Sequence, residues 1–146
     1  MQNKRTLLDR VKIDLVNVET NLKNMDDELF VDVAAYHLHQ SIEKMMKFHI
    51  TLTGNDFKRT HDLKILWGHL DDLGKNPPEW IWENSSILNK YQSETRYGED
   101  LVAIRREVKE FLILAKQYYK EVLDLTKIPL TDEDSNYKFS NLFDDI

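Results

Sequence analysis

Apolar residues recur at steps of three and four along most of the chain, which is the spacing of one face of an α-helix. Leu8, Val11 and Leu15 begin the first such stripe, and the last stripe keeps the spacing for more than six turns. Gly54, Gly74 and the Pro77-Pro78 pair separate the segments, as expected at helix ends. The pattern predicts helices over about residues 8–22, 28–53, 60–73, 79–95 and 101–125.

About five helices with short connections predict an all-α, up-and-down helical bundle in residues 1–127, with neighbouring helices antiparallel. Residues 128–146 are acidic and lack periodicity. We expect them to form a mobile or loosely docked C-terminal tail, or alternatively a short peptide that binds a partner. Trp80 and Trp82 are two residues apart, so they cannot both be buried on the same helix face. Either one is exposed as part of a dimer or partner surface, or both pack in the core against the tail.

Composition narrows the class of protein. The 146 residues suffice for one domain, and 41% apolar with 32% charged residues is a globular balance. The chain has no cysteine, which excludes disulfides and thiolate chemistry. No apolar run predicts a membrane span or a signal peptide, so the expected location is cytoplasmic, without membrane association. A net charge of −6 argues against nucleic-acid binding over the whole surface, but not against a local basic site.

The second predicted helix carries a line of polar residues, here called the polar seam. Its members fall on one side of the helix: Asp32, Tyr36, His39, Gln40, Glu43, Lys44 and Lys47. The seam has two interpretations. It can be a solvated face stabilised by a Glu43–Lys47 pair one turn apart, or it can face a groove against another helix.

The segment that follows favours the groove. Between residues 44 and 64 there are five lysines and arginines but only two aspartates. The turn at Gly54 is expected to fold the third helix back toward the second. We expect Thr60 to cap that third helix, whose free N–H groups would suit an anion such as phosphate.

Several short motifs, in their order and spacing, resemble the HEPN domain, a helical domain named for nucleotide binding in higher eukaryotes and prokaryotes. The stretch from Ala34 to Leu66 matches at Gln40, Glu43-Lys44, Lys47, Gly54 and His61-Asp62-Leu63. Asp14-Leu15 matches upstream, and Tyr91, Arg96 and Tyr97 match downstream, with Gly98 where the family has proline. The resemblance covers roughly residues 5–125.

The resemblance implies a bundle of about five helices, often a homodimer. Such domains are often encoded beside a minimal nucleotidyltransferase or in toxin–antitoxin systems. One branch cleaves RNA without a metal, using an arginine followed after four to six residues by a histidine. None of the six arginines here has a histidine at that distance, and Arg96 is followed by none. The sequence therefore argues against a ribonuclease without excluding one in which another histidine, such as His61, takes that role.

Three hypotheses remain. The first is a non-catalytic module that binds a nucleotide, an RNA phosphate or a nucleotidyltransferase partner through a polar groove formed by Gln40, Glu43, Lys44, Lys47, Arg59, His61, Arg96 and Tyr97. The second is a toxin-type endoribonuclease, and the third is a structural dimerisation domain with a buried ionic network. Arg96 can either tie down backbone carbonyls or contact phosphate. No metal-binding spacing and no cofactor motif occurs, so we expect neither a metal nor a cofactor.

Overall fold

The computed structural model describes residues 4–24, 28–97 and 103–126, and only the helical backbone of residues 4–6, 24 and 94–97. Within these ranges the regular elements are helices: α1 (Lys4–Asn24), α2 (Glu28–Leu52), α3 (Leu63–Asp72), α4 (Glu79–Glu83), α5 (Ser85–Tyr97) and α6 (Arg105–Thr126). The predicted all-α bundle is confirmed.

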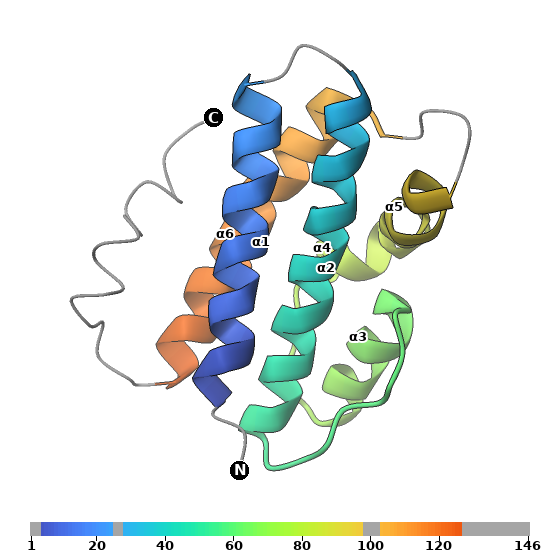
Figure 1. The fold of residues 1–146 in the computed structure, drawn as a ribbon. Helices are drawn as coiled ribbons and strands as arrows, with labels where there is room; N and C mark the ends of the chain where they lie inside the picture. The colour runs from blue at the N-terminus through green and yellow to red at the C-terminus, as the bar shows by residue number, and fades with distance from the viewer. Residues whose placement is uncertain (1–3, 25–27, 98–102, 127–146) are drawn as a thin grey trace, which may run out of the picture.

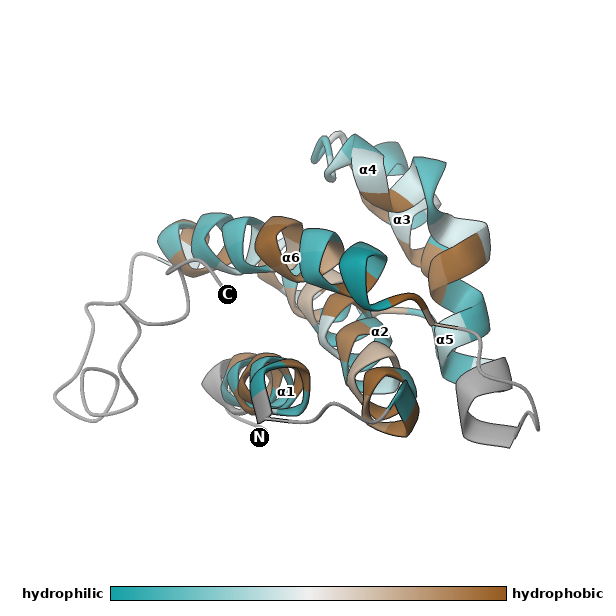
Figure 2. Cartoon of the chain, turned by 90° about the horizontal axis from the view of Figure 1, so that it is seen from above, coloured by the Kyte–Doolittle hydropathy of each residue, from teal (hydrophilic) through white to brown (hydrophobic). Residues whose placement is uncertain are grey.

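Helix α2 is the centre of the bundle, because it contacts α1, α3, α5 and α6. Figure 1 shows α1 and α2 side by side and antiparallel, with α6 crossing behind them. Seen from above, α3, α4 and α5 lie together on the other side of α2 from α1 (Figure 2). The loop between α2 and α3 runs beside α2 and brings the chain back toward the middle of that helix (Figure 1).

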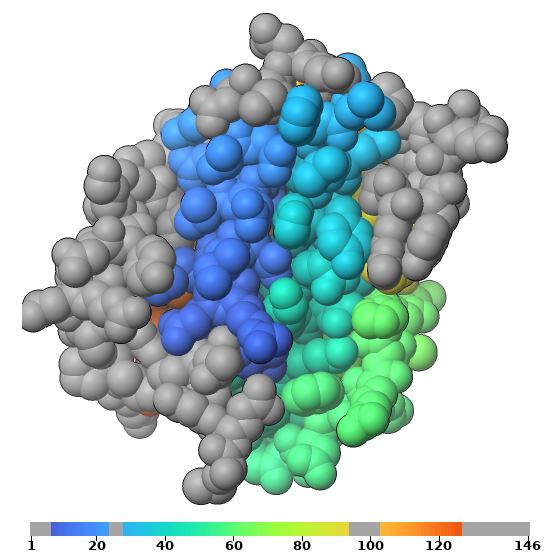
Figure 3. All heavy atoms as spheres, in the orientation of Figure 1, coloured from blue at the N-terminus to red at the C-terminus, as the bar shows by residue number. Residues whose placement is uncertain are grey.

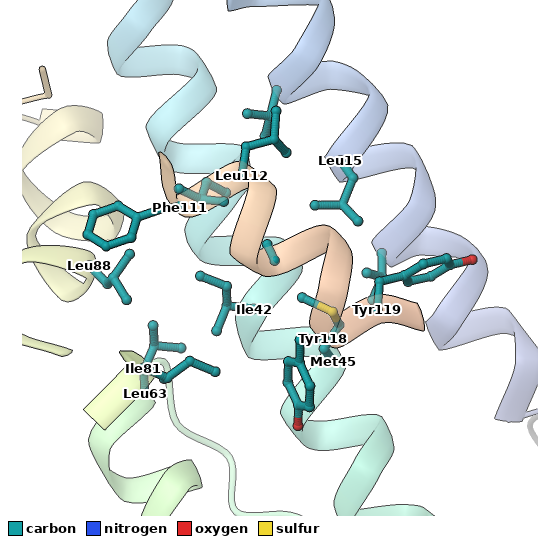
Figure 4. Packing of buried hydrophobic residues seen from close by; sticks show 14 of the residues in the cluster. Leu15, Ile42, Met45, Leu63, Ile81, Leu88, Phe111, Leu112, Tyr118 and Tyr119 are labelled. Carbon is teal, nitrogen blue, oxygen red and sulfur yellow. The ribbon is translucent and has the colours of Figure 1, made fainter. Parts of the chain in front are cut away.

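The core is made by the stripes that the spacing predicts. In α1 all five positions of the stripe are at most 4% exposed: Leu8, Val11, Leu15, Val18 and Leu22. In α2 the buried residues cover most of the circumference, as expected for a helix packed on several sides. Figure 4 shows Ile42 of α2 facing Leu63, Ile81 and Leu88 of the α3–α5 group.

The predicted fourth helix is divided at Asn84. Asn84 is the C-cap of α4, with φ −109° and ψ 13°, and its side-chain Nδ2 donates to the carbonyl of Trp80 at 2.8 Å. The chain therefore has six helices in its described part rather than five. Trp82 is 41% exposed, while Trp80 is half-buried and stacks on Phe111, so the alternative in which one of the two is exposed is confirmed.

The predicted start of the last helix is wrong, whereas its end, predicted near residue 125, is correct to within one residue. Helix α6 begins at Arg105, and the predicted stripe positions Ile104 and Leu125 are both more than half exposed. Arg105 explains the start, because its Nη1 donates to the carbonyl of Leu22 at 2.8 Å and ties α6 to the end of α1. Leu101 and the acidic tail, residues 128–146, lie outside the described residues.

Helices α1 and α2 share one broad face of the molecule (Figure 3). Ile13 and Val16 of α1 and Leu29 and Val33 of α2 are exposed. Figures 1 and 3 place the loop after α2 beside the C-terminal half of that helix. Of the helices that the structure describes, none is both long and apolar enough to cross a bilayer.

Candidate functional site

Glu43 is the centre of a polar cluster between α2 and the loop that leads to α3. Its side chain is only 5% exposed, and each carboxylate oxygen has a partner. Oε1 lies 2.9 Å from Nδ1 of His61, and Oε2 accepts a hydrogen bond from Nζ of Lys47 at 3.0 Å. A buried carboxylate requires such donors, because burial without them is costly. We call Glu43, Lys47, His61 and His39 the Glu43 cluster.

His61 lies between the buried Glu43 carboxylate and solvent. Because an ionised carboxylate only accepts hydrogen bonds, the contact assigns the Nδ1 proton to His61 and leaves Nε2 without a proton in the neutral ring. The His61 side chain is 65% exposed, and Nε2 makes no hydrogen bond to the described part of the chain. The arrangement therefore presents an oriented imidazole nitrogen at the surface.

His39 supports the cluster from inside the bundle. It is fully buried, and its Nε2 lies 2.9 Å from the backbone carbonyl of His61, so Nε2 carries the proton and donates. Its Nδ1 lies 4.0 Å from Oε1 of Glu43. Burial lowers the pKa of His39, and the Glu43 carboxylate opposes that shift only in part. Glu43 and His39 together hold both the ring and the backbone of His61.

The start of α3 differs from the prediction. The N-cap is Asp62, not Thr60; Thr60 instead accepts a hydrogen bond from the backbone N–H of Asp62. Oδ1 of Asp62 accepts from the backbone N–H of Lys64 at 2.9 Å, and Oδ1 of Asn89 accepts from that of Leu63 at 3.1 Å. The expectation of free N–H groups for an anion is therefore wrong for these two donors, because side chains already occupy them.

The polar seam does not face one groove. Lys44 pairs with Asp14 of α1 at 2.6 Å, and Nδ1 of His37 lies 3.1 Å from the other oxygen of the same carboxylate. Asp32 accepts from the backbone N–H of Ala103 at 2.9 Å, near the start of α6. The seam therefore contacts three neighbouring segments, which is possible because α2 is central to the bundle.

The predicted site residues are thus only partly assembled. Glu43, Lys47 and His61 come together, and Arg59 is exposed two residues before His61. Gln40 is half-buried on α2, and Lys44 is held by α1 instead. Arg96 and Tyr97 end α5, but their side chains lie outside the described part of the structure.

Two residues of the site were not predicted from the sequence, and the first is Asn89. Its Nδ2 donates to Oδ1 of Asp62 at 2.9 Å while its Oδ1 accepts from Leu63, so it locks α5 to the start of α3. No local pattern marks it, because its partners are 26 and 27 residues away. Phe57 was also missed; Nζ of Lys47 lies 5.2 Å from the centre of its ring.

No group of three or more histidines and carboxylates placed to hold a metal ion occurs among the described residues. The site is therefore a cluster of hydrogen-bonded and ionic side chains beside an exposed basic loop.

Fold and site together define a class of protein. It is a small helical bundle with an oriented surface histidine, His61, beside a loop that carries Lys58 and Arg59. The chain belongs to the HEPN domain family, since the family model described as the HEPN domain matches residues 5–126. Such a domain is in general a helical module related to nucleotides or RNA. No curated protein and no solved structure gives a significant match to the chain.

We expect the free energy of unfolding to fall as the pH drops below the ordinary histidine pKa of 6.5. Burial lowers the pKa of His39 and also that of His49, which the charge of Lys75 lowers further. Above pH 6.5 both rings are neutral in the folded and unfolded chains; below it only the unfolded chain takes up the protons readily, which favours unfolding. Each residue can contribute at most about 1.4 kcal/mol per pH unit.

Urea unfolding between pH 7.5 and 5.5 measures this slope. The range stays above the titration of Glu19, whose lowered pKa affects stability only in more acidic solution. His39→Gln combined with His49→Gln should flatten the dependence. An unchanged slope in that double variant would contradict the assignment.

Proposed function

We propose that the chain is a non-catalytic HEPN module that binds the phosphate of a nucleotide or of RNA. The binding surface consists of His61, Lys47 and Arg59, with Glu43 as the residue that positions the first two. The observation that carries the proposal is the hydrogen bond between the exposed His61 and the buried Glu43. It fixes a surface ring that, in its imidazolium form, can donate from Nε2 to a phosphate oxygen, at little further entropic cost on binding.

Charge supports the same surface. Lys58 and Arg59 are both exposed and follow each other in the loop, and Lys47 lies beside the same carboxylate as His61. Lys47 is already paired with Glu43, so in a chain of net charge −6 the attraction for an anion rests on Arg59 and its neighbour Lys58, which form no ion pair with the described residues. Arginine is well suited to phosphate because its planar donors can engage two oxygens at once.

RNA cleavage is the second candidate, and the Glu43–His61 contact is the observation that favours it. A carboxylate that holds one imidazole nitrogen leaves the other free to accept the proton of a ribose 2′-hydroxyl. The 2′-oxygen would then attack phosphorus, the P–O5′ bond would break as the 5′-oxygen takes a proton from water, and a 2′,3′-cyclic phosphate would form. The family's arginine–histidine spacing is absent from the sequence, so His61 would be the proton acceptor.

Thermal unfolding with ATP, GTP and a short RNA tests both candidates. At one hundred times its dissociation constant, a ligand should stabilise the protein by about 2.7 kcal/mol, which is a Tm shift of several degrees for a domain of this size. His61→Gln and Arg59→Gln should reduce the shift. Arg10→Gln, an exposed arginine on α1, is the matched control and should retain it.

The outcomes separate the candidates. Absence of a shift for every ligand, or equal shifts in wild type and both site variants, would refute the phosphate site. RNA recovered from the same samples shows whether it is intact. Cleavage by wild type but not by His61→Gln would replace the binding module with the ribonuclease.

A further inference from the structure

A hollow of about 330 Å³ lies on the surface of α3, and two of its lining residues, Lys58 and Asp62, flank Arg59 and His61 in the sequence. Its lining includes Trp82 of α4, Lys64 and Gly68 of α3, and Lys58 and Asp62 of the preceding segment. We propose that this hollow binds a nucleobase, stacked on Trp82, of the same nucleotide or RNA strand whose phosphate meets His61 and Arg59. The inference rests on the proposed function for its phosphate but not for its base.

Trp82 is a fixed aromatic surface. It is 41% exposed, and its ring centre lies 4.9 Å from that of Trp67. Trp67 is itself fixed, because its Nε1 donates to the carbonyl of Pro78 at 2.8 Å. An exposed indole that is held by packing offers a flat face and loses little conformational entropy when a ligand binds. Bases of any nucleotide sequence can stack on such a face.

The opposite wall is open because residue 68 is glycine. A Cβ built on Gly68 would meet no atom within 4 Å, so the helix backbone borders the hollow without a side chain above it. Lys64 and Asp72 stand one turn before and one turn after Gly68, and both line the hollow. Gly68 therefore leaves space for a flat ring between two polar side chains that can contact its edge.

The charges of the hollow match a neutral ring. Two lysines line the hollow, Lys64 and Lys58, of which Lys58 also borders the phosphate site, and they are matched in number by Asp62 and Asp72. Nζ of Lys64 lies 4.8 Å from the centre of the Trp82 ring, a cation–π contact. A stacked base would displace this flexible ammonium, which is then available to a neighbouring phosphate. Neither wall favours a strongly charged ligand.

The two surfaces are continuous in the chain. Lys58 and Asp62 line the hollow, and Arg59 and His61 lie between them in the sequence. Asp62 is fixed by Asn89 and by the N–H of Lys64, so the junction between the two surfaces is held in place. A base on Trp82 and a phosphate at His61 can therefore belong to one ligand, either a free nucleotide or a single strand of RNA.

The test measures binding of a labelled oligoadenylate RNA, an abasic strand of equal length, AMP and adenosine. Trp82→Ala should weaken binding of the oligoadenylate by about 5- to 150-fold, the range expected for one stacked base. Trp82→Phe, which keeps an aromatic face, should retain most of the affinity. Binding of the abasic strand should be the same in wild type and Trp82→Ala.

Gly68→Leu is the second variant. The added side chain enters open space on a helix, and leucine has the higher helix propensity, so the fold should be retained. The side chain should fill the hollow and weaken the oligoadenylate as Trp82→Ala does, without changing the affinity for the abasic strand.

Each result decides one of the two proposals. Equal affinities of wild type, Trp82→Ala and Gly68→Leu for the oligoadenylate would overturn the base site while leaving the phosphate site intact. Binding of adenosine that depends on Trp82, without any binding of the abasic strand, would support the base site and refute the phosphate site. AMP and the oligoadenylate compared at equal nucleotide concentration distinguish a free nucleotide from RNA. No binding of any base-containing ligand by the wild type would refute the base site.

Discussion

Replacing Ile42 by alanine is expected to lower the free energy of unfolding by about 2–5 kcal/mol. Ile42 is fully buried on the central helix and faces Leu63, Ile81 and Leu88 (Figure 4). Its truncation would leave a cavity where α2 meets the α3–α5 group, and neighbours from several helices cannot all move to fill it. Urea unfolding followed by circular dichroism measures the loss.

Val33→Ala on the same helix is the control. Val33 is 44% exposed, so its truncation should change the unfolding free energy by no more than about 0.5 kcal/mol. Equal effects of the two substitutions would mean that the packing of α2 differs from that described.

Glu43→Gln is expected to cost about 3 kcal/mol, because it removes one partner from a largely buried ion pair. The amide can offer an oxygen to only one of the two donors, His61 or Lys47, and turns an N–H₂ group toward the other. For a domain of this size the expected fall in Tm is roughly 6–12 °C. Thermal unfolding measures it, at a pH above 7 so that the buried histidines stay neutral.

Two comparisons make this result specific. Glu110→Gln, an exposed carboxylate on α6, should have little effect. His61→Gln should cost much less than Glu43→Gln, because His61 is mostly solvated and Lys47 still pairs with the carboxylate. A Glu43→Gln protein as stable as wild type would show that the Glu43 cluster contributes nothing to the fold.

The helices were predictable because most positions of their apolar stripes are buried, although Ile104 and Leu125 of the last stripe are exposed. In α1 the periodic positions from Leu8 to Leu22 are all in the core. The start of the last helix was not predictable: Ile104 continues the apolar spacing, yet α6 starts one residue later, where Arg105 contacts α1. Local spacing cannot register such a contact, since its partner is 83 residues away.

The candidate site was likewise only partly predictable from the sequence. The turn at Gly54, which has a φ of 85°, brings the third helix back to the second, and this much the sequence indicates. It does not indicate which seam residue meets which neighbour. Glu43 and Lys44 are adjacent in sequence, but a step of 100° around α2 sends one to His61 and the other to Asp14.

The anchoring of His61 has a consequence for how this domain can change over time. Between Gly54 and Thr60 the loop is exposed except for Phe57, whereas His61 is held by two side chains of α2 and Asp62 by one of α5. Changes in the length or charge of the loop side chains therefore need not move His61. Residues 55, 56, 58 and 59 can diverge while the imidazole stays where the bundle holds it, so that the proposed recognition of anions would vary on an unchanging framework.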